Sequence, residues 1–237
     1  MARKTDVTVY IGRFNPFHKG HAHVLKQALE TSKLVIVLVG SSGQARSLKN
    51  PFTFEERKEM IEKWHIGIDG DHAALRILPI RDYPYNDALW IRQVQSAVKK
   101  TITKFAVADG IANSKLLTDI AITGSDRDES TWYLNAFPQW KQALVEVYRE
   151  DNTLNVSATD VRDWLFSDNS MANATRGPAI QATLPDSTRR FLGNFVSEHR
   201  VAYEALVEER RFVEHYKKIW SVAPYPVTFT TVDAVVV

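Results

Sequence analysis

The ten residues Gly12-Arg-Phe-Asn-Pro-Phe-His-Lys-Gly-His21 decide how the N-terminal part of this chain folds. A short apolar run, 7–11, precedes them, and an amphipathic run, 22–29, follows them. This order predicts a strand, a basic glycine-bearing turn and a helix. In α/β proteins, the amides and the positive dipole end of such a helix face the phosphates of a nucleotide. His18 and His21 are three residues apart, so both can lie on one side of the first helical turn.

Strands and helices continue to alternate outward from this turn. Besides 7–11, apolar runs predict strands at 34–39, 75–80, 119–123 and 143–148. Helical spacing and capping residues predict helices at 21–30, 53–64, 87–100 and 159–166. The alternation predicts an α/β fold, with a doubly wound, Rossmann-like parallel sheet of about five strands. Its ligand site should lie beyond the carboxyl ends of the strands, where the strand order reverses.

The rest of the chain predicts a helical C-terminal extension. Small polar residues predict a mobile loop at 167–183, Pro185 opens a helical region, and 195–220 resembles one long helix. Two prolines make 223–226 an extended linker, and a β-rich run follows to Val237. The predicted division is therefore 1–166, 167–222 (loop and helical extension) and 223–237 (linker and terminal strand).

Composition narrows the class of protein. The 237 residues are 44% hydrophobic, and their net charge of +2 gives no argument for nucleic acid or a membrane as partner. The chain has no cysteine, which excludes disulfides, thiol catalysis and cysteine-bound metal. No apolar run approaches the roughly 20 residues of a membrane span, and no signal-peptide core opens the chain. We expect a cytoplasmic protein.

The string GRF-x-PFH-x-GH resembles the HxGH motif of the nucleotidylyltransferase superfamily. Its form is that of archaeal-type nicotinamide mononucleotide (NMN) adenylyltransferases, and of proteins that fuse this domain to a Nudix hydrolase. Many relatives carry Gln where this chain has Asn15. A second segment, Val156-Ser-Ala-Thr-Asp-Val-Arg162, is similar to the superfamily's ISSTxxR-type motif, with Ala158 for the middle Ser. The resemblance covers about 5–166, so 1–166 is predicted to be the nucleotidylyltransferase domain.

The resemblance implies that the chain joins ATP and NMN into NAD and pyrophosphate, without a covalent intermediate. The implied catalytic residues are His18, His21 and Arg162. The implied ATP-binding residues are Gly12, Arg13, Phe14, Lys49, Gly124, Arg127, Ser157 and Thr159. Lys49 falls near a basic position that some relatives fill with Arg, and Arg46 is the alternative. Mg²⁺ is the expected cofactor, held mainly by the ATP phosphates with no metal site in the protein.

The segment 82–90 resembles the family segment in which an Asp and a Trp bind the nicotinamide. The chemistry agrees, because the Asp82 carboxylate can accept hydrogen bonds from a carboxamide, and the Trp90 indole can stack on a pyridinium cation. The same carboxylate would repel the carboxylate of the deamidated nucleotide, nicotinate mononucleotide. Asn15 is the third predicted NMN-binding residue. The alternative for Trp90 is core packing on an apolar helix face.

Several alternatives remain at this stage. The chain could use another phosphorylated acceptor, bind NMN or NAD as a non-catalytic sensor, or be a fragment of a class I tRNA synthetase. The presence of Asp82, Trp90, His18, His21 and Arg162 favours the NMN reaction. The terminal run 228–237 resembles the first strand of a Nudix domain, but it could instead extend a sheet edge or pair with another subunit. Archaeal relatives suggest a homo-oligomer.

Overall fold

The computed structural model describes residues 5–68, 70, 72–108, 118–124, 129–146, 148–150, 154–155, 157–167 and 170–222. It confirms the predicted α/β fold with a five-stranded sheet in the order β3-β2-β1-β4-β5, in which all strands are parallel. The strands are β1 (Thr5–Gly12), β2 (Ser32–Val39), β3 (Ala74–Pro79), β4 (Ile120–Gly124) and β5 (Lys141–Leu144). The order runs one way from β1 to β3 and the other way from β4 to β5. The reversal therefore lies between β1 and β4, beside the turn at Gly12.

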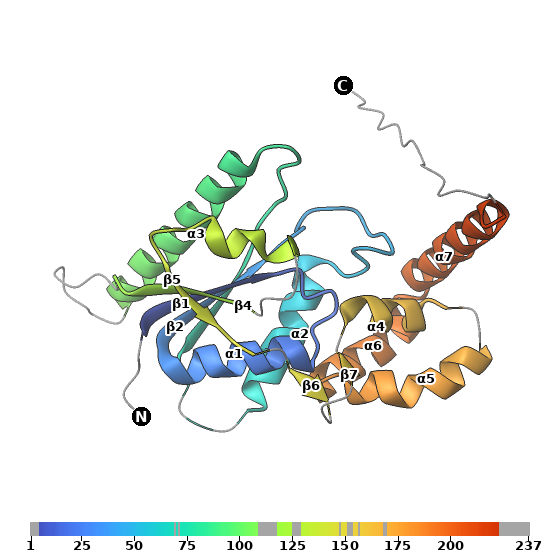
Figure 1. Cartoon of the computed structure of the whole chain (residues 1–237). Coiled ribbons are helices and arrows are strands. Elements are labelled where there is room, and N and C mark those ends of the chain that lie inside the picture. The colour runs from blue at the N-terminus through green and yellow to red at the C-terminus, as the bar shows by residue number, and fades with distance from the viewer. Residues whose placement is uncertain are drawn as a thin grey trace.

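Helices cover both faces of this sheet. Figure 1 shows α1 (Lys19–Thr31) and α2 (Phe54–Ile66) on one face, with α3 (Asp87–Ala108) and the 3₁₀ helix η1 (Glu129–Asn135) on the other. Side chains alternate between the faces along each strand, so β1 contributes to two cores. Val7, Val9 and Ile11 pack on the α3 side, whereas Tyr10 packs on the α1 side. The sheet is thus buried on both faces, as its β-branched sequence requires.

A helical extension follows β5 and a short ribbon, β6 (Arg149–Glu150) and β7 (Leu154–Asn155). It consists of α4 (Ala158–Leu165), α5 (Ser170–Ala182), α6 (Asp186–Glu198) and α7 (Arg200–Trp220). In Figure 1 these helices lie beside α2, away from α3. The rings of Phe191 and Phe195 contact Phe52 edge-on, with centroids 5.6 and 5.1 Å away. The extension therefore shares the α1–α2 core.

Two predictions for the extension were wrong. The mobile loop predicted at 167–183 is largely the helix α5, because buried Ile180 and close packing of Gly177 on Trp164 outweigh its small polar composition. A Cβ on Gly177 would lie 3.1 Å from the indole Nε1 of Trp164. The single helix predicted at 195–220 is interrupted at His199, whose φ of −110° and ψ of 41° are not helical. The break allows Phe195 and Leu206 to enter the same core.

The fifth strand was also predicted with the wrong bounds. It covers 141–144 instead of 143–148, because it pairs with β4, which ends at Gly124 opposite Leu144. The helix predicted at 87–100 continues to Ala108, since Ile102 and Phe105 extend its buried face. The division at residue 166 stays a prediction, and 223–237 lies outside the described residues. Across the described helices, no segment has the length and apolarity to cross a bilayer.

Candidate active site

A cavity of about 550 Å³ lies at the carboxyl ends of β1, β2 and β3. It is the place where a doubly wound sheet is expected to hold a ligand. The described structure brings five predicted residues together in its wall: Gly12, Arg13, His21, Asp82 and Trp90. Gly12 and Arg13 follow β1, His21 lies in the first turn of α1, and Asp82 and Trp90 flank the start of α3.

The two histidines form the N-terminal cap of α1. The His18 ring Nδ1 accepts from the backbone N–H of His21 at 3.4 Å, and the His21 ring Nδ1 accepts from the backbone N–H of His18 at 3.3 Å. The rings are stacked, with centroids 3.6 Å apart. Because an Nδ1 that accepts a hydrogen bond carries no proton, a neutral ring must hold its proton on Nε2. The cap therefore makes each imidazole a donor at Nε2.

The two histidines differ in exposure. His18 is 2% exposed, whereas His21 is half-buried and lines the cavity together with Gly20. The rings of Phe14 and Phe17 support His21 from behind, with centroids 4.9 and 6.0 Å away. The geometry therefore presents His21 to a ligand and holds His18 beneath it.

Phe14 and Gly12 form one packing unit under the turn. Phe14 is 1% exposed and has a positive φ of 51°. A Cβ on Gly12 would lie 2.8 Å from the Phe14 ring. Gly12 is thus required by the ring of Phe14, and it also lies in the cavity wall. Phe14 itself does not line the cavity, although we predicted that it binds ATP.

A buried arginine that the sequence reasoning missed connects the strand ends. The guanidinium of Arg57, 1% exposed, donates to the carbonyl oxygens of Arg13 and Gly40, both at 2.7 Å, and to that of Thr53 at 3.1 Å. Burial lowers the pKa of Arg57 to about 10, with nearby Asp82 opposing the shift. The Thr-x-x-Glu-Arg sequence at the start of α2 would have pointed to Arg57 only if the partners of its charge had been known from the sequence.

Asp82 and Trp90 both line the cavity. The Asp82 carboxylate accepts from the backbone N–H of Ser41 at 3.2 Å and from the Gln44 side chain at 2.8 Å, so its orientation is fixed from the β2 side. Trp90 is half-buried, and its ring also packs against the α3 core. Trp90 therefore both lines the cavity and packs in the core.

Two further aromatic residues of η1 line the same cavity and were missed. The Trp132 ring centroid is 5.4 Å from that of Trp90, and Trp132 is 46% exposed, so its ring is available at the cavity mouth. The Tyr133 hydroxyl donates to the Ile11 carbonyl oxygen at 3.1 Å. Burial raises the pKa of Tyr133 to about 12. The aromatic pair after the charged run at 126–129 was the available sequence signal.

The second sequence motif lies against the first. Ser157 caps α4, since its hydroxyl accepts from the Thr159 N–H at 3.1 Å. Arg162 donates to the Thr159 hydroxyl at 3.0 Å and to the backbone carbonyl of Asn15 at 2.8 Å. Burial, together with the neighbouring charge of Arg13, lowers the pKa of Arg162. The bond from Arg162 to the Asn15 carbonyl joins residues 147 positions apart and brings the two motifs into one structure.

Lys49 and Arg46 have different surroundings. Arg46 makes a two-pronged ion pair with Glu56, at 2.7 and 2.6 Å, and lies over the Phe195 ring at 5.4 Å. Lys49 is exposed and shares a separate cavity of about 370 Å³ with Arg162. Arg46 is therefore committed to a structural pair, which leaves Lys49 as the better placed cation.

Two other predicted residues, Asn15 and Gly124, lie away from the main cavity. Asn15 is 2% exposed beneath the turn, where its side-chain oxygen accepts from the Phe52 N–H at 3.3 Å. Gly124 is buried at the end of β4 and faces Tyr133 and Leu134, which would lie 3.3 and 3.4 Å from a Cβ there. Arg127 lies outside the described residues.

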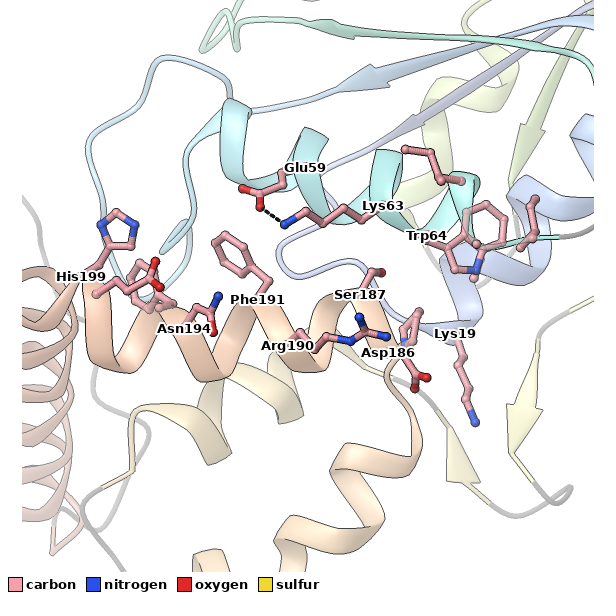
Figure 2. A pocket seen from close by; sticks show the side chains of 17 residues that line it. Lys19, Glu59, Lys63, Trp64, Asp186, Ser187, Arg190, Phe191, Asn194 and His199 are labelled. Atoms are coloured by element: carbon pink, nitrogen blue, oxygen red, sulfur yellow. Dashed lines mark hydrogen bonds and ion pairs between the residues drawn. The ribbon is translucent and has the colours of Figure 1, made fainter.

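A larger groove, of about 680 Å³, lies between α2 and α6 (Figure 2). Trp64 and Phe191 line it, and an ion pair joins Lys63 to Glu59 at 2.6 Å on its α2 side. Those predicted site residues that the structure describes do not line this groove, although Lys19 from the HxGH turn does. This larger groove is thus separate from the candidate active site.

Comparisons with known proteins agree with this geometry. Residues 9–163 match the cytidylyltransferase-like family. The chain is 33% identical over 192 residues to the nicotinamide/nicotinic acid mononucleotide adenylyltransferase of Acinetobacter baylyi, covering 81% of this chain and 87% of that protein. It is 39% identical over 98 residues to the nicotinamide-nucleotide adenylyltransferase of Saccharolobus solfataricus, covering 41% of this chain and 56% of that protein.

The fold also matches a solved structure closely. The bifunctional NMN adenylyltransferase/ADP ribose pyrophosphatase from Francisella tularensis superimposes with a TM-score of 0.71 and 31% sequence identity, over 95% of this chain. The present chain spans 59% of that longer one. A second structure of that protein, with AMP and a manganese ion, gives a TM-score of 0.69. The chain therefore belongs to the cytidylyltransferase-like family and, within it, to the nicotinamide-nucleotide adenylyltransferases.

Proposed function

We propose that this chain transfers the AMP group of ATP to NMN, giving NAD and pyrophosphate. The observation that carries the proposal is the single cavity that combines a carboxylate and an indole, Asp82 and Trp90, with the phosphate-binding turn at Arg13 and His21. A ligand with a pyridinium ring at one end and a phosphate at the other suits both ends. The Acinetobacter baylyi relative, 87% of which is covered by this chain, has such an activity in its name.

The proposed reaction is one displacement at phosphorus. An oxygen of the NMN phosphate forms a bond to the α-phosphorus of ATP, and the bond from that phosphorus to the bridging oxygen of the β-phosphate breaks. Pyrophosphate leaves with the electron pair. The attacking oxygen is already anionic near pH 7, so no general base is needed. Catalysis then rests on positioning two polyanions and on stabilising the charge that develops around the α-phosphate.

His21 and Arg162 are the proposed donors to that charge. The α1 cap holds His21 with its proton on Nε2, so a neutral ring can donate without a change of tautomer. Arg162 is fixed to the backbone of the turn through Asn15, and its burial strengthens its interaction with a phosphate. We propose that Arg13, Lys49 and the α4 amides near Ser157 and Thr159 bind ATP. His18 is proposed to support the His21 ring through the reciprocal cap, and its own catalytic role stays a prediction.

At the other end, we propose that Asp82 and Trp90 bind the nicotinamide. Asp82 accepts from Ser41 and Gln44, and a carboxylate has capacity for further donors such as a carboxamide N–H. The Trp90 face stacks on the pyridinium ring. The name of the Acinetobacter baylyi relative covers both nicotinamide and nicotinic acid mononucleotides, so a preference for NMN in this chain stays a prediction.

Mg²⁺ is the proposed cofactor. Its preferred ligands are hard oxygens, whereas the phosphate end of the cavity carries imidazole and guanidinium groups. The ATP phosphates are therefore the proposed ligands, and bound Mg²⁺ would neutralise part of their charge. The roles of Gly12, Phe14, Gly124 and Arg127 in binding ATP, and of Asn15 in binding NMN, stay predictions, as does a homo-oligomer.

An end-point assay tests the proposal. The protein is incubated with ATP, Mg²⁺ and either NMN or nicotinate mononucleotide, and dinucleotide and pyrophosphate are measured. We expect equal amounts of NAD and pyrophosphate from NMN, and slower product from the deamidated nucleotide. A sugar phosphate or phosphopantetheine in place of NMN should give no product. Binding of NMN without turnover would instead support a sensor.

A further inference from the structure

Two neighbouring residues of α7 touch the two sides of the proposed ATP-phosphate site. The Glu209 carboxylate oxygens accept from the backbone N–H of Leu48, at 3.3 and 3.2 Å. The Arg210 guanidinium donates to the carboxylate of Asp163. Leu48 directly precedes Lys49, and Asp163 directly follows Arg162. One helical step on α7 therefore reaches the chain neighbours of Lys49 and Arg162, two of the cations that border the 370 Å³ cavity.

The helix that carries this pair is itself fixed to the body of the protein. Leu206 is 3% exposed in the core shared with α1 and α2. The Tyr203 hydroxyl donates to the carbonyl oxygen of Leu165, at the end of α4, at 3.1 Å. These contacts lie one and two turns before Glu209, so the pair is presented from a supported segment of α7.

The two cations need such support for different reasons. Lys49 lies in the loop between β2 and α2 with its side chain exposed, and no ion pair fixes it within the part of the chain that the structure describes. Within the described contacts, the loop backbone at Leu48 is bonded to Glu209 across 161 residues of sequence. Arg162 is held to the turn by Asn15, and the Arg210–Asp163 pair holds the outer side of the same helix. Contacts from α7 thus reach the two segments that carry Lys49 and Arg162.

We infer that Glu209 and Arg210 are positioning residues that hold Lys49 and Arg162 at the spacing needed for the ATP triphosphate. The inference rests on the proposed function. It gives the helical extension a part in substrate binding, although neither residue needs to touch ATP itself. The consequence is selective: contacts to the triphosphate should weaken, whereas the Asp82–Trp90 end of the other cavity should be unaffected.

Steady-state kinetics with matched variants tests this inference. We expect Glu209→Ala and Arg210→Met to raise KM for ATP about five- to tenfold, the size of one charge-assisted hydrogen bond, with KM for NMN unchanged. In the reverse direction, KM for pyrophosphate should rise and KM for NAD should change less. The control is Glu208→Ala, because Glu208 is exposed on the same helix and pairs with Arg211. Circular dichroism and thermal melting verify that each variant folds.

Conservative and exchanged pairs separate positioning from general destabilisation. Glu209→Gln keeps an acceptor for the Leu48 N–H and should remain near the wild-type KM. Exchange of the ion pair, Asp163→Arg with Arg210→Asp, should recover part of the loss seen in Arg210→Met. Equal effects on both substrates, or the same KM for ATP in Glu209→Ala, Arg210→Met and Glu208→Ala, would overturn the inference while the function stands. A wild-type protein that makes no dinucleotide would overturn the proposed function and the inference together.

Discussion

Asp82 combines a structural contact with a charge, and the two can be separated. Its carboxylate accepts from Ser41 and Gln44, so a neutral amide at this position can keep one acceptor and much of the shape. The charge is what should distinguish NMN from nicotinate mononucleotide. Two unit charges 4 Å apart repel each other by about 4 kcal/mol at an effective dielectric constant of 20. Asp82 is exposed, so its repulsion of a second carboxylate is weaker than this value.

We predict that Asp82→Asn narrows the preference for NMN about fivefold, which corresponds to about 1 kcal/mol. The measurement is the ratio of kcat/KM values for NMN and nicotinate mononucleotide. Asp87→Asn is the matched control, because Asp87 is an exposed carboxylate in the wall of the same cavity. An unchanged ratio in Asp82→Asn, or an equal change in both variants, would refute the assignment of Asp82.

At the level of single elements, the cap of α1 performs two tasks. The His21 ring accepts from the His18 N–H, as Glu or Gln does in an ordinary capping box, and it also lines the cavity. His18 and His21 therefore cap the helix, and this is compatible with a role in catalysis. Substitutions that keep the cap and remove the imidazole distinguish the two tasks.

We predict that His21→Gln and His21→Ala both lower kcat at least 100-fold, the loss typical of one donor to a developing anion. Gln can still accept from the His18 N–H, so it should cost less stability than Ala, for which we expect about 1 kcal/mol. Turnover and urea unfolding are measured on the same preparations. Near-normal turnover in His21→Gln would show that capping, and not the imidazole, is the function of this side chain.

The same elements show what could be predicted from the sequence. The capping box of Thr53 with Glu56 and the cap at Ser157 can be recognised in the sequence, because cap residues act on amides two or three positions away. The α5 helix was missed because it is stabilised by contacts with residues outside the helix: Gly177 packs on Trp164, and Ile180 enters the core. The buried Arg57 and the Glu209–Leu48 bond were missed for the same reason, since their partners are carbonyl and amide groups that carry no sequence signal.

At the scale of the whole molecule, the Arg46–Glu56 pair joins the loop after β2 to α2, and Arg46 also contacts the helical extension. Arg46 reaches both Glu56 oxygens and lies over Phe195 of α6, while Glu56 also accepts from the backbone N–H of Thr53 at 2.8 Å. Burial alone would raise the pKa of Glu56, but the hydrogen bonds from Arg46 and Thr53 outweigh it and the pKa is lowered. The ionised form is therefore stabilised by folding.

This direction fixes how stability should depend on pH. A carboxyl group whose pKa is lower in the folded state contributes stability that is fully present above its unfolded pKa, here 4.5, and is lost as pH falls through the folded pKa. We predict that Glu56→Gln lowers the unfolding free energy by about 1 to 3 kcal/mol at pH 7, and that the difference from wild type shrinks below about pH 4.5. Urea unfolding at a series of pH values measures this difference directly.

Glu59→Gln is the control, since its pair with Lys63 is exposed and should contribute little at any pH. A difference that stays constant with pH, or that appears equally in Glu59→Gln, would mean that the charge of Glu56 in its pair with Arg46 does not stabilise the fold.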